Sequence, residues 1–334
     1  HLIVNLSMYH IHRPMFYEKI EKVLLYFKNV INKYYSNAEI FNIFKSNKKI
    51  LLFLLDEKIL SIDYYVMNQF RTESLYERYF IPEIDSSNKD KIPENFYEDR
   101  KTGENERYIC QLIQKDSVQE FISYINKNSI SVDSSIERSI FETNYYLIKK
   151  LDSRRLTTVN LIQYAAFYGS IQIFRYLLMN KARLYNSIMC YAIHGNNPEI
   201  IQILEQELGK IDKDLCVKMY KMAIKCHHNE IADYLKDNYL NDLDEKSMSI
   251  LFLNYYNFKY FTNDFFDDDS LFHYFCAYDY CLFISFLSNE SHDDDDYDNE
   301  IKKNLYLNHI TNHMLIELNI LFLNDIKNIC FNII

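Results

Sequence analysis

Hydrophobic residues recur along most of this chain at spacings of three and four, which is the period of a helix with one buried face. Between Phe16 and Tyr35 the apolar positions follow this spacing. The stretch Glu39–Leu55 then predicts a helical hairpin, because a polar turn at Ser46–Asn47 separates two apolar helices. The pattern indicates a helical N-terminal domain over residues 1–81, for which divergent repeats are one interpretation.

A helical hairpin recurs three times in succession further along the chain. The copies are Tyr164–Leu177, Tyr191–Leu204 and Met222–Leu235. Each copy has a small residue at the same place, and the steps between these residues are 27 and 31: Ala165, Ala192 and Ala223. A repeat of this length is typical of a solenoid, in which each unit buries its apolar faces on its neighbours. We expect neighbouring helices to approach closely at these alanines.

The turn residues support the hairpins independently. In the second copy, Asn197 stands at the expected N-cap, Pro198 at the first helical position and Glu199 directly after it. Asparagine accepts hydrogen bonds from the first free amides, and proline lacks the amide that would be left unpaired. Glutamate interacts favourably with the positive end of the helix. Ser170 occupies the same cap position in the first copy.

The first copy resembles the ankyrin repeat. Asn160–Leu178 carries the paired alanines Ala165 and Ala166 of that family, then Gly169 after two variable residues, and aliphatic residues in the second helix. The resemblance gives these alanines and the glycine structural roles, and the cap chemistry gives Pro198 one. The resemblance implies an all-α fold: an ankyrin-type helical-hairpin solenoid of degenerate short repeats, preceded by the helical N-terminal domain.

Other stretches extend this resemblance over residues 107–290. Leu112–Ile125 indicates a unit upstream of the clear copies. Downstream, Ser270–Asp279 keeps the histidine of the ankyrin motif at His273, which the resemblance makes a structural residue. A degenerate unit is expected before it, with helices near Ser247–Tyr255 and Tyr256–Phe261.

Three segments are similar to a narrower group, ankyrin proteins from trichomonad protists. These segments are Arg100–Asn105, Ser139–Asn144 and Ala166–Phe174. In that group the part before the clear repeats is a domain of unknown function, so the resemblance says little about biochemistry. Residues 82–106 hold many charges and two prolines, which predicts a linker. Residues 126–158 are predicted to be a longer connection, in which Ser139–Asn144 forms a short ordered segment.

The ankyrin resemblance also implies a binding surface. In that family, the two variable residues before the glycine of the hairpin turn lie toward the concave, ligand-facing side. Carried over, the candidate partner-binding residues are Phe167, Tyr168, His194, Lys225 and Tyr278. The aromatic residues could anchor a protein partner, as interface hot spots often do. The alternative is that they pack on the next unit.

Charge and cysteine content narrow the choice of partner and compartment. The net charge of −10 argues against nucleic acid or an anionic membrane as the general partner. Lysines between Lys210 and Lys225 make one region basic; we interpret them as a solvated face, with a specific anion site as the alternative. The 7 cysteines form no CysXXCys motif, which indicates reduced thiols and a cytoplasmic location. Charges interrupt every long apolar stretch, so no membrane span is predicted.

Motifs that would carry chemistry are weak. Cys226–His228 is the obvious metal candidate, but adjacent residues rarely converge on one ion, and we interpret it as a solvent-facing hairpin turn. The acidic loop Ser291–Glu300 lacks the central glycine of a calcium-binding loop. No metalloprotease, serine-hydrolase or phosphate-loop motif occurs. We expect no metal, no cofactor and no enzymatic activity, and residues 301–334 are predicted to be a helical cap or an atypical tail.

The function predicted from these features is a non-enzymatic scaffold that binds a protein partner on the concave solenoid surface. One alternative is a structural component that assembles with copies of itself. A further alternative is a small-molecule binder or an enzyme at the junction near residues 82–150.

Overall fold

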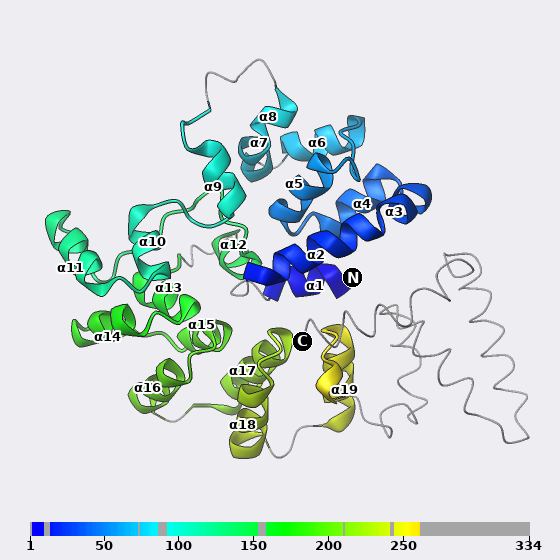
Figure 1. The fold of residues 1–334 in the computed structure, drawn as a ribbon. Coiled ribbons are helices and arrows are strands. Elements are labelled where there is room, and N and C mark those ends of the chain that lie inside the picture. The colour runs from blue at the N-terminus through cyan, green and yellow to red at the C-terminus, as the bar shows by residue number, and fades with distance from the viewer. Residues whose placement is uncertain are drawn as a thin grey trace, which may run out of the picture. The chain divides into compact units, whose positions relative to one another are not determined.

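The computed structural model describes residues 2–9, 14–72, 74–85, 92–152, 158–209, 211–240 and 244–260. The chain divides into two compact units, one of them Ile3–Asn241 and the other comprising residues 1–2 and the chain from Asp242 onward. The described residues are mostly helical, and one isolated antiparallel bridge joins Ser135 to Asn160. The fold class is therefore all-α, as the sequence predicts (Figure 1).

The N-terminal part of the larger unit is made of short helices: α1 (Leu2–Tyr9), α2 (Pro14–Tyr26), α3 (Lys28–Tyr34), α4 (Asn37–Phe44), α5 (Lys48–Asp56), α6 (Tyr64–Thr72), α7 (Ser74–Tyr79), α8 (Ile81–Ile84) and α9 (Phe96–Thr102). The helices α4 and α5 form the predicted hairpin, because the Asn47 side chain accepts hydrogen bonds from the amides of Lys49 and Ile50. Buried aromatic rings hold this part together: Phe70 and Phe80 stack with centroids 4.2 Å apart.

The stretch expected to be a linker, residues 82–106, includes a helix. It contains α9, and both Phe96 and Arg100 of that helix are buried. The Arg100 guanidinium donates to the Glu83 carboxylate and to the Tyr79 carbonyl. A charged residue contributes to a core when its charge is paired in this way, which composition alone does not reveal.

Helical hairpins follow one another in the second half of the larger unit (Figure 1). They are α10 (Tyr108–Gln114) with α11 (Val118–Lys127), α13 (Leu161–Tyr168) with α14 (Ile171–Met179), α15 (Ile188–Gly195) with α16 (Pro198–Leu208), and α17 (Lys213–Lys225) with α18 (Asn229–Tyr239). First helices pack on first helices in the order α10, α13, α15, α17, and α11, α14 and α16 pack in the same order. The three copies recognised in the sequence are thus consecutive layers of one stack. A separate short helix, α12 (Tyr145–Asp152), lies between α11 and α13 in the chain.

Each of these hairpins turns at a residue with left-handed backbone. The residues are Asp116, Gly169, Asn196 and His227, with φ of 51°, 68°, 51° and 53°. At three of the turns, the next amide donates to a carbonyl five residues back, as from Ser170 to Ala165. This bond satisfies a carbonyl at the helix end that would otherwise lack a partner.

The alanines with predicted structural roles lie inside the stack. Ala165, Ala166, Ala192 and Ala223 are fully buried in the first helices. Pro198 begins α16, and Asn197 before it accepts hydrogen bonds from the amides of Glu199 and Ile200. His273 lies outside the described residues, as do Tyr278, the acidic loop and residues 301–334.

The second unit is described over residues 244–260. Its helix α19 (Glu245–Asn254) begins where the Asp244 side chain accepts the Ser247 amide. This helix matches the first of the two helices expected there, and a short 3-10 turn, η2 (Phe258–Tyr260), stands in place of the second. Across the part of the chain that the structure describes, no helix is long and apolar enough to span a bilayer.

Candidate functional site

The stacked first helices present one stripe of equivalent positions. Alignment on Ala165, Ala192 and Ala223 brings three positions of each helix into register, and their spacing of three and four puts them on one side of the helix. We call these nine residues the first-helix face: Asn160, Gln163 and Phe167 at α13; Ser187, Cys190 and His194 at α15; Lys218, Lys221 and Lys225 at α17. It contains three of the residues that we expected to bind a partner.

Exposure of the first-helix face rises along the stack. At α13 all three positions are buried. At α15, Ser187 and Cys190 are half-buried and His194 is buried. At α17, Lys218 and Lys221 are exposed and Lys225 is half-buried. The face is therefore covered at one end and open at the other, and its open end is basic.

Helix α12 covers two residues of the closed part of the face, Phe167 and His194. The Tyr146 ring lies parallel to the Phe167 ring with centroids 6.3 Å apart. It also contacts Tyr191 and His194, at 5.0 and 5.8 Å. Phe167 and His194 in turn stack on each other at 4.3 Å. Both side chains are fully buried, so they do not lie on the open surface expected for them. Phe167 packs on a side chain of the next layer, which is the alternative to partner binding given for the aromatic residues.

The other expected partner-binding residues also make contacts within the chain. The Tyr168 hydroxyl accepts hydrogen bonds from Gln114 and Asn144, and burial is the first cause that raises the pKa of this tyrosine. The Lys225 ammonium lies 5.9 Å from the ring centre of Tyr9 in α1. Tyr278 lies outside the described residues.

Two of the segments that carry the narrower resemblance, Arg100–Asn105 and Ser139–Asn144, meet in the structure. Thr143 donates to the Gly103 carbonyl through its amide, at 3.0 Å, and through its hydroxyl, at 2.7 Å. Asn105 donates to the Glu137 carbonyl at 3.0 Å. Segments about 40 residues apart in the chain thus form one buried polar junction through paired backbone groups.

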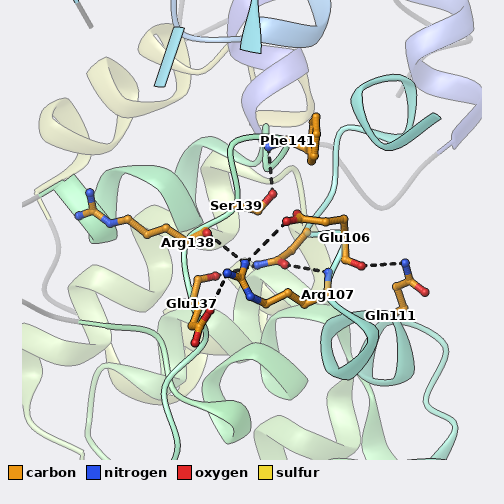
Figure 2. A network of polar contacts seen from close by, with 8 residues as sticks. Glu106, Arg107, Gln111, Glu137, Arg138, Ser139 and Phe141 are labelled. Carbon is orange, nitrogen blue, oxygen red and sulfur yellow. Dashed lines mark hydrogen bonds and ion pairs between the residues drawn. The ribbon is translucent and has the colours of Figure 1, made fainter. Parts of the chain in front are cut away.

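Arg107 ties the edge of this junction together, as Figure 2 shows. Its guanidinium contacts the Glu137 carboxylate at 2.5 Å and donates to the Arg138 carbonyl at 3.1 Å. A longer contact of 3.7 Å joins it to Glu106. Ser139 begins the next segment, where its hydroxyl accepts the Phe141 amide. A planar guanidinium with five donors suits such a cluster of carboxylate and carbonyl oxygens.

A buried carboxylate and a buried ammonium lie at the centre of the junction. Lys48 from α5 donates to the Ile140 carbonyl and lies over the Tyr79 ring. One oxygen of Glu142 accepts the Asn144 amide, and the other has no hydrogen-bond partner among the described residues. Burial raises the pKa of Glu142 to about 7, against the lowering effect of Asn144 and Lys48.

A small cavity adjoins Glu142. The lining residues are Asn105, Ile136, Ser139, Glu142, Leu147, Val159 and Tyr164. Its volume open to the centre of a water molecule is about 10 Å³. That is room for about one water molecule. The cavity is too small for a substrate, so it gives no support to a small-molecule binder or enzyme at this junction.

The Cys226–His228 turn differs from its prediction. It does form the hairpin turn, with His227 in the left-handed region. However, Cys226 and His227 are buried, so the turn is not solvent-facing as expected. Burial also raises the pKa of the Cys226 thiol. Among the described residues, no group of three or more His, Cys, Asp or Glu side chains is placed to hold a metal ion.

Sequence reasoning missed α12 and its tyrosine. The only local signal was helical spacing in a short apolar run, Leu147, Ile148 and Leu151, inside a predicted connection. Comparison with known proteins adds no further guidance: no family model matches the chain, and neither the curated proteins nor the solved structures contain a match.

Proposed function

We propose that this chain is a non-enzymatic protein-interaction module in the cytosol, an ankyrin-type solenoid of degenerate short repeats that presents its first-helix face to a protein partner. The observation that carries the proposal is the in-register stacking of first helices, which aligns equivalent positions of three hairpins in one stripe. Stacked hairpins form a preformed surface, and such surfaces typically bind with little change of backbone.

The open end of the face is where we place the partner. Lys218 and Lys221 are exposed, and neither forms an ion pair with a described residue. With Lys225 they make a row of positive charge on a chain whose net charge is −10. A local patch that opposes the overall charge attracts a complementary patch and discourages other partners. The partner expected here is a protein with an acidic surface.

Charge reversal at the open end tests this proposal. We would compare the wild type with Lys218→Glu plus Lys221→Glu in affinity capture from a lysate of the source cell. The matched control is Lys127→Glu plus Lys236→Glu, which changes two exposed lysines of α11 and α18 by the same charge. A protein retained by the wild type and the control but lost from the face variant supports the proposal. Identical captures by all three proteins would overturn it.

Self-association is the second candidate, and exposed tyrosines in the N-terminal part favour it. Tyr64 is 90% exposed and Tyr26 is 62% exposed. Large aromatic side chains at a surface are typical of interface hot spots. Light scattering at micromolar concentration distinguishes the two candidate functions. A wild-type dimer that becomes a monomer in Tyr26→Ala plus Tyr64→Ala would support self-association. A monomeric wild-type protein would contradict self-association and leave partner binding as the proposed function.

A further inference from the structure

Helix α12 touches the first-helix face through one side chain in particular. The half-buried Tyr146 ring contacts Phe167 of α13 and both Tyr191 and His194 of α15. We propose that α12 is an internal ligand of the first-helix face, and that the slot formed by these three rings is a binding site for an aromatic side chain carried on a helix. This inference rests on the proposed function, because it names the kind of partner that the same face accepts.

The ring contacts of Tyr146 reach two consecutive layers of the stack. They lie on α13 and α15. A single side chain thus spans layers that the chain itself keeps in register. An external ligand on such a stack would be expected to bridge layers in the same way.

The slot has the geometry that an aromatic ring requires. Phe167 offers a parallel ring face, with an interplanar angle of 2°, and Tyr191 offers an edge at 69°. Parallel and edge-to-face arrangements at these separations are the favourable ones for aromatic pairs. The thiol of Cys190 lies near the hydroxyl end, so the slot also accommodates a polar tip. These features select a tyrosine over an aliphatic side chain.

The contacts of α12 that the structure describes lie at its first turn. Tyr146 and Leu147 pack there, and the amide group of Asn144 just before the helix donates to Tyr168. None of the more extensive helix-to-helix contacts among the described helices involves α12. Elements with few packed contacts open at lower free energy than the core of a fold. Release of α12 would therefore expose the slot while the hairpins stay stacked.

A partner that replaces α12 binds only the open form. Its apparent affinity is reduced by the fraction of molecules in which α12 has left the face. The probe for this competition is a fluorescein-labelled peptide with the sequence of residues 139–152, titrated into the full chain and followed by anisotropy. We expect weak binding to the wild type and roughly tenfold or tighter binding to Tyr146→Ala, in which the slot is vacated.

Two controls sharpen this titration. Tyr185→Ala removes an exposed tyrosine outside α12 and should bind the peptide as weakly as the wild type does. The same peptide carrying Tyr146→Ala should bind neither protein. A Tyr146→Ala protein with unchanged circular dichroism that does not bind the peptide would overturn the inference.

Hydrogen exchange on the wild-type protein tests the release of α12 even if the Tyr146→Ala protein fails to fold. Amides of α12 should exchange roughly tenfold or more faster than those of α15, through local opening. Equal protection of both helices would overturn the inference, because α12 would then open only with the whole unit. Peptide binding to Tyr146→Ala together with identical captures in the lysine experiment would remove the acidic-partner proposal and leave the aromatic slot standing.

Discussion

Among single residues, Glu142 is the one whose ionisation should matter most for stability. Its side chain is 3% exposed, and one carboxylate oxygen lacks a hydrogen-bond partner among the described residues. Burial is the largest cause that raises its pKa, Asn144 and Lys48 lower the pKa and Glu104 raises it, and the net value is about 7. The folded protein therefore favours the neutral acid, whereas an unfolded chain ionises this group at about pH 4.3.

The first prediction concerns Glu142→Gln. Because the folded pKa is raised, the stabilisation by Glu142 is full below about pH 4.3 and is lost as pH rises through about 7. Glutamine keeps the shape without the charge, so the variant should be more stable than the wild type at pH 8, by about 1–3 kcal/mol. Urea denaturation at pH 5 and pH 8 measures this.

The matched control for Glu142 is Glu207→Gln, which changes an exposed glutamate of α16. It should leave the pH dependence of unfolding as in the wild type. If Glu142→Gln has the same pH dependence of unfolding as this control, ionisation of the Glu142 carboxyl does not change the stability of the protein.

The second prediction concerns Gly195→Ala at the end of α15. Helix propensity alone favours alanine over glycine by about 1 kcal/mol. However, a Cβ at Gly195 would lie 2.2 Å from the Ala166 carbonyl oxygen and 3.0 Å from the Gly169 amide. Both neighbours are backbone atoms, so the layers must separate, and we expect a loss of about 1–3 kcal/mol. Thermal unfolding shows whether Gly195→Ala stabilises or destabilises the protein. A raised melting temperature would show that α13 and α15 are farther apart than in this structure.

Among elements, the hairpin is the repeated unit, and the first helix of each layer carries the contact with the next. Its turn tolerates aspartate, asparagine or histidine as well as glycine at the left-handed position. The helix-end hydrogen bonds, rather than one residue type, thus define the turn. This variation explains why the copies look degenerate in sequence while their backbones repeat.

The third prediction tests the register of the layers through Ala192→Asp. Ala192 is fully buried in α15, so aspartate would bring an unpaired charge and extra volume into the stack. We expect the middle layers to unfold, seen as loss of helical circular dichroism at 222 nm and a lower melting temperature. Gln202→Asp, at an exposed position of α16, should have little effect. An unchanged melting curve for Ala192→Asp would refute the register.

For the whole molecule, the division into two compact units is the main feature. The unit Ile3–Asn241 contains the N-terminal helices, the polar junction and the described hairpin stack. Lys48 from α5 and Gly103 after α9 both bond to residues 139–144, so the N-terminal helices and the stack share one core. The helical N-terminal part and the repeats are therefore packed together through the segment expected to be a connection.

The fourth prediction follows from this division. A protein that ends at Asn241 should keep the cooperative melting of the larger unit, with a melting temperature within about 5 °C of the corresponding transition in the full chain. The physical reason is that the core contacts of that unit lie within it. Differential scanning calorimetry of both proteins measures this, and a non-cooperative transition in the shorter protein would show that its core depends on the second unit.

The sequence by itself determined the helices, the hairpins with their caps and turns, and the places of the buried alanines. These features depend on neighbours three or four residues apart, as at Asn197 and Pro198, so periodicity and cap chemistry are sufficient to predict them. Only the tertiary structure decided which side of the stack is open. Tyr146 covers Phe167 and His194, and residues 139–144 bury Glu142 against α5, through contacts between segments that are distant or irregular in sequence. Burial by such segments leaves no periodic signal, because it depends on where the chain returns in space.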